Sequence, residues 1–211
     1  WIEGAACILA KKDDANLTER VEHLIDCIEA HQEADGYFNI YFTVCEKNNR
    51  FKKRAYHELY CAGHLIEAAV EYYEATGKDR FLKCMMKYAD CIEKAFITEK
   101  TAAFTTCGHE EIELALYRLY KCTGNKKYLD MSLFFINMRG AKTEVDIGGI
   151  YNDMNDQHHK PVREQREAEG HAVRACYLYS AMADAAKETG DKELLSSCKS
   201  IFDDIINHKM Y

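Results

Sequence analysis

Histidines offer the clearest chemistry in this sequence. His57, Cys61 and His64 are separated by four and three residues, so on a helix they share one face. That face could bind a metal ion, although the spacing differs from the H-E-x-x-H zinc motif and three ligands on one helix rarely complete a site. Two alternatives stay open: a histidine held by hydrogen bonds at a helix entry, or polar contact with a hydroxyl-rich ligand. The histidines that follow favour the last of these.

Two further histidines, His109 and His171, each follow a glycine, as His64 does. The repeated Gly-His predicts that these histidines stand where equivalent helices begin. Histidines at the same end of a helical array could converge on one ligand. Neutral imidazole suits sugar hydroxyls because it can both donate and accept hydrogen bonds. The alternative, equally open, is that Gly-His is merely a device that starts a helix.

Other polar groups surround these histidines in the sequence. Glu110, Glu111 and Glu113 could act as catalytic acids, but carboxylates in the first turn of a helix stabilise its dipole, and that role is favoured for Glu110 and Glu111. A polar loop around the only proline is either plain surface or part of a binding wall. The segment 35–41 combines aromatic rings with carboxylate and amide groups, which suits carbohydrate or, equally, a loop tucked over the core. The residues concerned are Asp153, Asp156, His158, His159, Arg163, Glu164 and Gln165 in the first stretch, and Asp35, Tyr37, Asn39 and Tyr41 in the second.

Long helices must position these groups. The 211 residues are 47% hydrophobic and include 11 glycines and one proline, so few residues interrupt a helix. Apolar residues recur at helical spacing in 17–30, whereas 35–42 predicts a loop or a short extended segment. From residue 55 onward a unit repeats, consisting of Gly-His, a long helix, Thr-Gly and a second helix. The second helices are predicted at 80–94, 127–137 and 193–208, and each Thr-Gly predicts a helix C-cap with a left-handed glycine.

Repeated αα-hairpins predict an all-α solenoid or closed toroid. Three irregular loops, at 31–55, 98–107 and 139–170, enter the Gly-His helices from the same end. We therefore expect the loops to gather on one face of the array, where a binding site is commonly built.

Composition excludes several classes of function. With 28 basic and 35 acidic side chains, a net charge of −7 and no basic block, neither nucleic acid nor a membrane is an expected partner. No apolar run is long enough to cross a membrane, and neither a nucleotide-binding glycine motif nor Gly-x-Ser-x-Gly is present.

Ten cysteines without a C-x-x-C pair predict reduced core thiols in a cytoplasmic protein. Since the chain begins at Trp1 rather than Met, a signal peptide is left open.

Six strings, in order along the whole chain, resemble glycoside hydrolase family 127, the β-L-arabinofuranosidases. The most specific is His-Glu-Leu-Tyr-Cys-Ala-Gly-His. The resemblance implies an (α/α)6-barrel catalytic domain, of which residues 1–211 would be a single incomplete part lacking N-terminal helices and the C-terminal part. It also implies a bacterial-type glycosidase that removes terminal β-L-arabinofuranose from plant-type arabinosides with retention of configuration. The strings are 1–5, 35–42, 57–69, 108–116, 161–165 and 170–174.

The resemblance also implies an uncommon mechanism, in which a zinc-held cysteine is the nucleophile and a glutamate is the acid/base. The Glu-x-Cys motif and paired cysteines of that site do not occur in this chain. We therefore expect no catalytic residue, no metal ligand and no zinc here, with the zinc site downstream of residue 211. The resemblance assigns substrate binding to His57, His109 and His171, and less firmly to His159 and Gln165. It leaves His64 to helix packing.

Two other functions stay open. One is a non-catalytic α/α-toroid module that binds carbohydrate or protein, and the other is a related glycosidase acting on another sugar. A twelve-helix ring with helices of ~15 residues needs on the order of 300 residues, so this chain supplies about two-thirds of it. Such an arc leaves apolar faces uncovered at both ends, which allows self-association.

Overall fold

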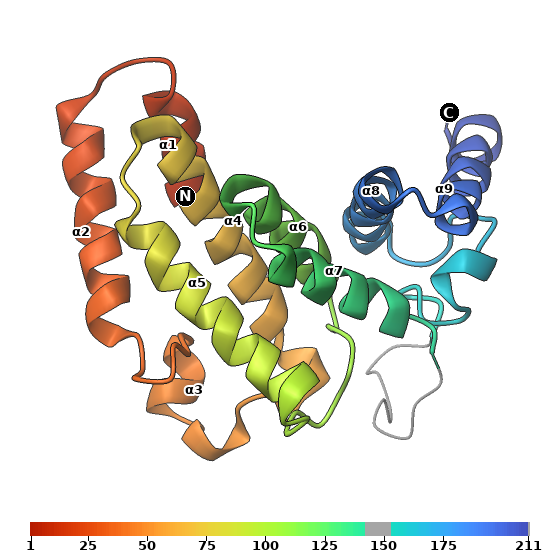
Figure 1. The fold of residues 1–211 in the computed structure, drawn as a ribbon, viewed down its shortest axis with the longest axis horizontal. Coiled ribbons are helices and arrows are strands. Elements are labelled where there is room, and N and C mark those ends of the chain that lie inside the picture. The colour runs from red at the N-terminus through yellow and green to blue at the C-terminus, as the bar shows by residue number, and fades with distance from the viewer. Residues whose placement is uncertain (142–152, 211) are drawn as a thin grey trace.

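The structure, a computed structural model, describes residues 1–141 and 153–210, and within these ranges it is helical without a β-strand (Figure 1). The prediction of an all-α fold is confirmed. Two helices continue as π-helical turns, α5 over Lys94–Thr98 and α9 over Ile205–Lys209. Short 3-10 helices cover Lys47–Asn49, Arg54–Tyr56 and Val162–Glu164. The α-helices are α1 Ile2–Leu9, α2 Ala15–His31, α3 Ile40–Val44, α4 Glu58–Thr76, α5 Arg80–Glu93, α6 Ile112–Thr123, α7 Lys126–Met138, α8 Ala172–Thr189 and α9 Lys192–Asp204.

Two rows of helices build the arc in the part of the chain that the structure describes. α1 contacts α4, α4 contacts α6 and α6 contacts α8, so these four helices form an inner row. Each is followed by an outer helix that packs on it, giving the hairpins α1–α2, α4–α5, α6–α7 and α8–α9 (Figure 1). This is the arrangement of part of an (α/α)6 barrel. No helix in the described ranges is long and apolar enough to span a membrane.

The hydrophobic core runs between the two rows. α4 is buried along most of its length because α1, α5 and α6 all pack against it. One cluster joins the elements from α1 to α7 and a smaller one joins α7 to α8 and α9. The core thereby fixes where the inner helices begin, which is where the candidate site lies. The largest buried apolar side chains include Tyr37, Phe42, Ile66, Tyr88 and Phe135 in the first cluster and Leu178, Met182, Leu194 and Ile201 in the second.

The predicted Thr-Gly caps are confirmed at all three places. Gly77, Gly124 and Gly190 follow their helices in the left-handed conformation, with φ of 72°, 70° and 71°. At each cap the threonine hydroxyl donates to the carbonyl four residues earlier and accepts from the backbone N–H two residues later. The cap therefore satisfies backbone groups at the helix end and turns the chain into the outer helix.

Replacing Gly124 with Ala is expected to destabilise the chain by about 1 kcal/mol, because φ of 70° is costly for a residue with a Cβ atom. No atom lies within 4 Å of the added Cβ, so the cost is conformational and not a clash. Urea denaturation measures it. The matched control is Gly4→Ala inside α1, which also has open space and should be neutral or stabilising. Equal effects of the two substitutions would contradict this account.

One prediction about local structure is confirmed and one is wrong. Segment 35–42 begins as the predicted loop and ends in the start of α3, because the Asn39 side chain accepts from the N–H of Phe42 and begins a helix. Gly63-His64 does not begin a helix, since it lies within α4. A Cβ atom on Gly63 would come within 2.6 Å of Glu111 Cγ, so the glycine is there to admit the start of α6. His57, not His64, is the residue in front of α4.

The expectation that most cysteines are core thiols is also wrong. All ten are free, but only Cys84 and Cys107 are buried. The exposed thiols lie largely on the two end hairpins and on α3 and α4, where a helix face has no neighbouring helix to cover it. The exposed cysteines are Cys7, Cys27, Cys45, Cys61 and Cys176.

Candidate functional site on the inner helices

Three of the predicted site residues meet at the N-terminal ends of the inner helices. The ring centroids of His57 and His109 are 5.9 Å apart, and those of His109 and His171 are 6.1 Å apart. His109 therefore lies between the other two. Because α4, α6 and α8 are neighbours in the inner row, the residues that precede them are brought together although they are far apart in the sequence.

Local backbone structure places each ring. His57 precedes α4 with φ of 57°, a left-handed conformation that is uncommon for a residue other than glycine and often marks a functional position. His109 lies in the loop before α6. His171 is the N-cap of α8, where its Nδ1 accepts from the backbone N–H of Arg174.

Hydrogen bonds set different tautomers for two of these histidines. His109 Nδ1 lies 3.0 Å from the carbonyl oxygen of Glu110, which can only accept, so Nδ1 carries the hydrogen and the neutral ring presents Nε2 as an acceptor. His171 has the opposite tautomer, because its Nδ1 accepts a hydrogen bond from a backbone N–H and the ring hydrogen therefore lies on Nε2. One ring thus offers an acceptor and the other a donor, which together can bind hydroxyl groups.

The electrostatic surroundings of His57 and His109 keep these two rings uncharged. Burial lowers the pKa of His57, and the nearby Arg174 cation acts in the same direction. Burial also lowers the pKa of His109, to which Arg174, His57 and His171 contribute, against an opposing hydrogen bond to Glu110. Both imidazoles are therefore neutral at neutral pH and serve as hydrogen-bonding groups rather than cations.

Sequence reasoning missed the aromatic partners of the histidines. The ring centroid of Tyr60 is 4.4 Å from that of His109 and 4.5 Å from that of His64, while Tyr177 lies 5.9 Å from both histidines. His64 is thus part of this histidine cluster, here defined as His57, Tyr60, His64, His109, His171 and Tyr177, as well as of α4. Tyr60 could have been found, because it lies one turn from both His57 and His64 on α4.

The two less firmly assigned residues lie in the segment between α7 and α8. Gln165 is 1% exposed and donates its amide hydrogens to the carbonyls of Gln157 and Lys160. His159 is partly buried, and burial together with the Lys160 cation lowers its pKa. The geometry of Gln165 supports a role in holding the loop before α8.

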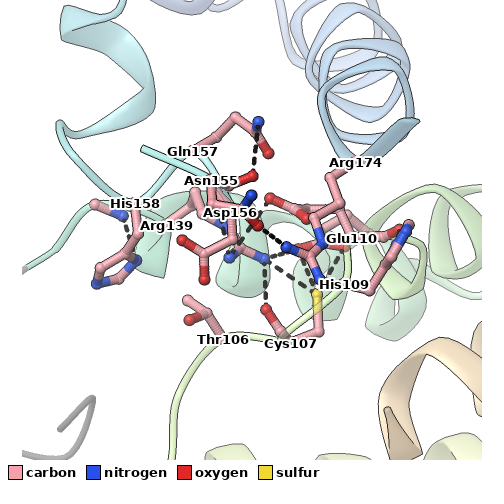
Figure 2. A network of polar contacts seen from close by, with 12 residues as sticks. Thr106, Cys107, His109, Glu110, Arg139, Asn155, Asp156, Gln157, His158 and Arg174 are labelled. Carbon is pink, nitrogen blue, oxygen red and sulfur yellow. Dashed lines mark hydrogen bonds and ion pairs between the residues drawn. The ribbon is translucent and has the colours of Figure 1, made fainter. Parts of the chain in front are cut away.

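A buried network around Arg139 holds the loops that carry the site (Figure 2). The guanidinium is fully buried, 3.5 Å from Glu110 Oε1 and 3.2 Å from Glu113 Oε1. It also donates to the carbonyl oxygens of Cys107 and Asp156, at 3.0 and 3.1 Å. One side chain after α7 therefore joins the loop that precedes α6 to the loop that precedes α8.

The glutamates before α6 differ from their predicted role. Glu110 and Glu111 precede α6 and are fully buried, so they are not exposed first-turn carboxylates, and only Glu113 lies in the first turn. Burial raises the pKa of Glu110 to about 8, against the opposing charge of Arg139. Close helix contact at Gly63, invisible in the local sequence, is what buries this segment.

Tyr37 of the aromatic segment is tucked over the core, whereas Tyr41 in α3 is 47% exposed. Tyr37 is fully buried, its hydroxyl donates to Glu58 Oε1 at 2.5 Å, and the Arg50 guanidinium lies 4.2 Å from the ring centroid. The N–H of Phe51 donates to the same carboxyl group. Glu58, at the start of α4, thus anchors the loop that leads into His57.

Glu58 predicts a pH dependence of stability. Burial raises its pKa from 4.5 to about 7, while hydrogen bonds from Tyr37 and Phe51 and the Arg50 cation oppose the rise. Between these values the folded chain keeps a proton that the unfolded chain has released, so this contribution to stability is present below pH 4.5 and is lost as the pH rises through 7.

The measurement is the unfolding midpoint temperature of wild type and Glu58→Gln from pH 4 to pH 8. We expect the wild-type midpoint to fall more steeply over the window between 4.5 and 7, because glutamine cannot titrate. Parallel curves for the two proteins would contradict this assignment.

The possible metal trio at the start of α4 is not formed. Among the described residues, the one group whose ligand atoms lie within 4.8 Å of one another is Glu3, His64 and Glu67. It contains no cysteine, so the zinc cage of cysteines and glutamate that the resemblance implies does not fit these residues. Burial also raises the pKa of the Cys107 thiol, which disfavours the thiolate that such a nucleophile needs.

Comparison with known proteins agrees with the motifs. The family description "β-L-arabinofuranosidase, GH127 catalytic domain" matches residues 1–211. A non-reducing end β-L-arabinofuranosidase of Bifidobacterium longum subsp. longum is 36% identical over 230 residues, which cover 100% of this chain and 35% of that protein.

Solved structures give the same result. A GH127 β-L-arabinofuranosidase from Geobacillus stearothermophilus T6 is 42% identical with a TM-score of 0.94, covering 100% of this chain and 35% of that one. A second GH127 β-arabinofuranosidase is 38% identical with a TM-score of 0.86, covering 100% and 33%. The chain therefore spans about a third of the length of these relatives. With the motifs, the hairpin arc and these matches in agreement, the chain belongs to glycoside hydrolase family 127.

Proposed function

We propose that the protein containing these residues is a glycoside hydrolase that releases terminal β-L-arabinofuranose from plant-type arabinosides with retention of configuration. In this proposal His57, His109 and His171 form one wall of the sugar pocket. The observation that carries it is the meeting of three imidazoles at the ends of neighbouring inner helices. The names of the relatives support the choice of sugar.

The geometry explains how such a wall would recognise a pentose. The ring of His109 presents an acceptor and that of His171 a donor, so neighbouring hydroxyls of one sugar can be bound in a defined orientation. His57 has a buried Nδ1 that receives no hydrogen bond within the described ranges, and a hydroxyl could supply its partner. Tyr60 and Tyr177 add aromatic surface beside these groups.

His159 and Gln165 stay predictions of substrate binding. The Oε1 of Gln165 is buried and has no hydrogen-bond partner in the part of the chain described, and the same holds for Nδ1 of His159. Both lie in the loop that the Arg139 network fixes. In this proposal, His159 and Gln165 also shape the end of that loop beside His171.

We propose that residues 1–211 supply contacts to the substrate and not the catalytic groups. We expect the zinc-held cysteine and the acid/base glutamate to lie outside this chain, and no zinc to be bound by its cysteines. These residues then act by binding and orienting the sugar, while the zinc would supply an activated thiolate nucleophile when bound.

The test is hydrolysis of an aryl β-L-arabinofuranoside. The protein as encoded in full should hydrolyse it and should prefer it to the α-anomer and to aryl glycosides of other pentoses and hexoses. The first-formed anomer, followed by NMR, should be the β-sugar. Turnover of a different glycoside alone, or tight binding of arabinose oligomers without hydrolysis, would contradict the proposal in favour of another sugar or a non-catalytic module.

Residues 1–211 on their own are expected to hydrolyse no arabinofuranoside, because a pocket wall without a nucleophile binds but does not react. The same aryl substrate at high protein concentration checks this result, with the full protein as the positive control. Turnover by residues 1–211 that is abolished by removing zinc would show that the machinery is present here.

Two further expectations complete the proposal. Uncovered apolar surface supports self-association. A hollow of about 500 Å³ is lined by residues of α1, α2 and α3, where Ile40 and Val44 are 70% and 76% exposed. On α9, Phe202 is 62% exposed.

Ten free cysteines support a cytoplasmic location, since that compartment keeps thiols reduced.

A further inference from the structure

A second cluster of ionisable groups lies on the inner row beside the histidine cluster. Glu3 projects from α1, His64 and Glu67 from α4, and Glu111 from the segment just before α6. One ligand atom each from Glu3, His64 and Glu67 lies within 4.8 Å of the others. We propose that these four residues bind a divalent transition-metal cation that joins three neighbouring inner helices.

The fold explains why the four groups meet. His64 and Glu67 are three residues apart on α4 and share a face. α1 packs against α4 and brings Glu3 to that face. Gly63 lets the chain before α6 approach α4 so closely that Glu111 Oε1 lies 3.3 Å from Nδ1 of His64.

Glu111 supplies independent support, because its buried carboxyl group lies beside His64 and Glu67. The residue is fully buried, and within the described ranges neither carboxyl oxygen receives a hydrogen bond. A buried carboxylate is costly unless it is paired, hydrogen-bonded or bound to a metal. Burial, a side-chain hydrogen bond with Glu67 and the charge of Glu67 raise its pKa to about 10, so without a cation this carboxyl group keeps its proton, which a bound metal would displace.

Arg118 already pairs with part of this cluster. Its guanidinium lies 3.1 Å from Glu67 Oε1, 3.6 Å from Glu3 Oε1 and 3.1 Å from Glu71 Oε2. One cation faces three carboxylates there, and each carboxylate has a second oxygen that can face the metal. Arg118 thus resembles the outer partners that orient the ligands of metal sites.

The donor set indicates the class of ion. One imidazole nitrogen with carboxylate oxygens suits Mn²⁺, Fe²⁺, Co²⁺ or Zn²⁺, whereas Ca²⁺ and Mg²⁺ prefer oxygen alone. No thiol takes part. This site is therefore chemically different from a cysteine cage, and Mn²⁺ can probe it because soft thiolate ligands do not favour that ion.

The experiment is a Mn²⁺ titration of the 211-residue chain followed by electron paramagnetic resonance. We expect saturable binding at one equivalent, with ¹⁴N modulation from His64 in the pulsed spectrum. His64→Gln should abolish the modulation, and His64→Gln and Glu3→Gln should each weaken binding about tenfold or more. The control is His23→Gln, an exposed histidine on α2, which should bind as wild type. Unfolding midpoints without metal verify that each variant is folded.

The opposite results would overturn the proposal. They are the absence of saturable binding, ¹⁴N modulation that persists in His64→Gln, or equal weakening by His23→Gln and His64→Gln. None of these outcomes depends on hydrolysis, so the proposal of a metal site can be disproved while the proposed glycosidase function stands.

Discussion

Replacing Arg139 with Met is expected to lower the free energy of unfolding by about 3–5 kcal/mol, the cost of breaking a buried ion pair by removing one partner. The guanidinium is fully buried against Glu110 and Glu113 and also donates to the carbonyls of Cys107 and Asp156. Methionine would fill much of the space but leave the Glu113 carboxylate and two carbonyl groups without the hydrogen bonds of the guanidinium, and Glu110 without its neighbouring cation. Urea denaturation of the chain measures the loss.

The matched control is Arg80→Met at the start of α5. Arg80 pairs with Glu22, Asp26 and Glu29, but these groups are exposed or partly exposed, so the substitution should cost no more than about 1 kcal/mol. Similar losses for the two variants would show that the Arg139 network does not hold the loops. A folded Arg139→Met chain should also lose sugar binding, because the network positions the segment that carries His109.

Replacing His109 with Ala is expected to lower kcat/KM of the full enzyme for an aryl β-L-arabinofuranoside about 10- to 100-fold, the effect of losing a hydrogen-bond partner of a bound hydroxyl. His109 is the central ring of the cluster and presents Nε2 as an acceptor. Steady-state kinetics of the variant and the wild type measure the change.

His109→Gln tests the chemistry of this loss, because an amide can still accept a hydrogen bond, and it should recover part of the activity. His23→Ala removes an exposed histidine on the outer helix α2 and should leave kcat/KM unchanged. If His109→Ala kept full activity, or if the loss matched a loss of folded protein, the assignment of His109 to the sugar pocket would be wrong.

Much of the fold could be predicted because its signals are local. The Thr-Gly pairs at 76–77, 123–124 and 189–190 end helices through hydrogen bonds within a few residues, so the sequence alone was sufficient to place them. The hairpins follow from those caps. Convergence of His109 and His171 could be predicted from the repeated Gly-His, whereas His57 was assigned by the family resemblance, because His64, its counterpart in the repeat, lies within α4.

Other features depend on contacts between distant segments and could not be predicted. Gly63 resembles the other Gly-His glycines in sequence, yet its role is to admit Glu111 against α4. The same contact buries Glu111, which the local pattern placed in the first turn of its helix. Tyr177 joins the histidine cluster only because α8 packs beside α6.

The central claim is that the histidine cluster binds the arabinofuranosyl unit. A crystal structure of the full protein soaked with L-arabinose tests it most directly. We expect the sugar between His57, His109 and His171, with hydroxyls within about 3.2 Å of at least two of the imidazole nitrogens. A sugar bound elsewhere, with all three imidazoles beyond hydrogen-bonding distance, would contradict the account.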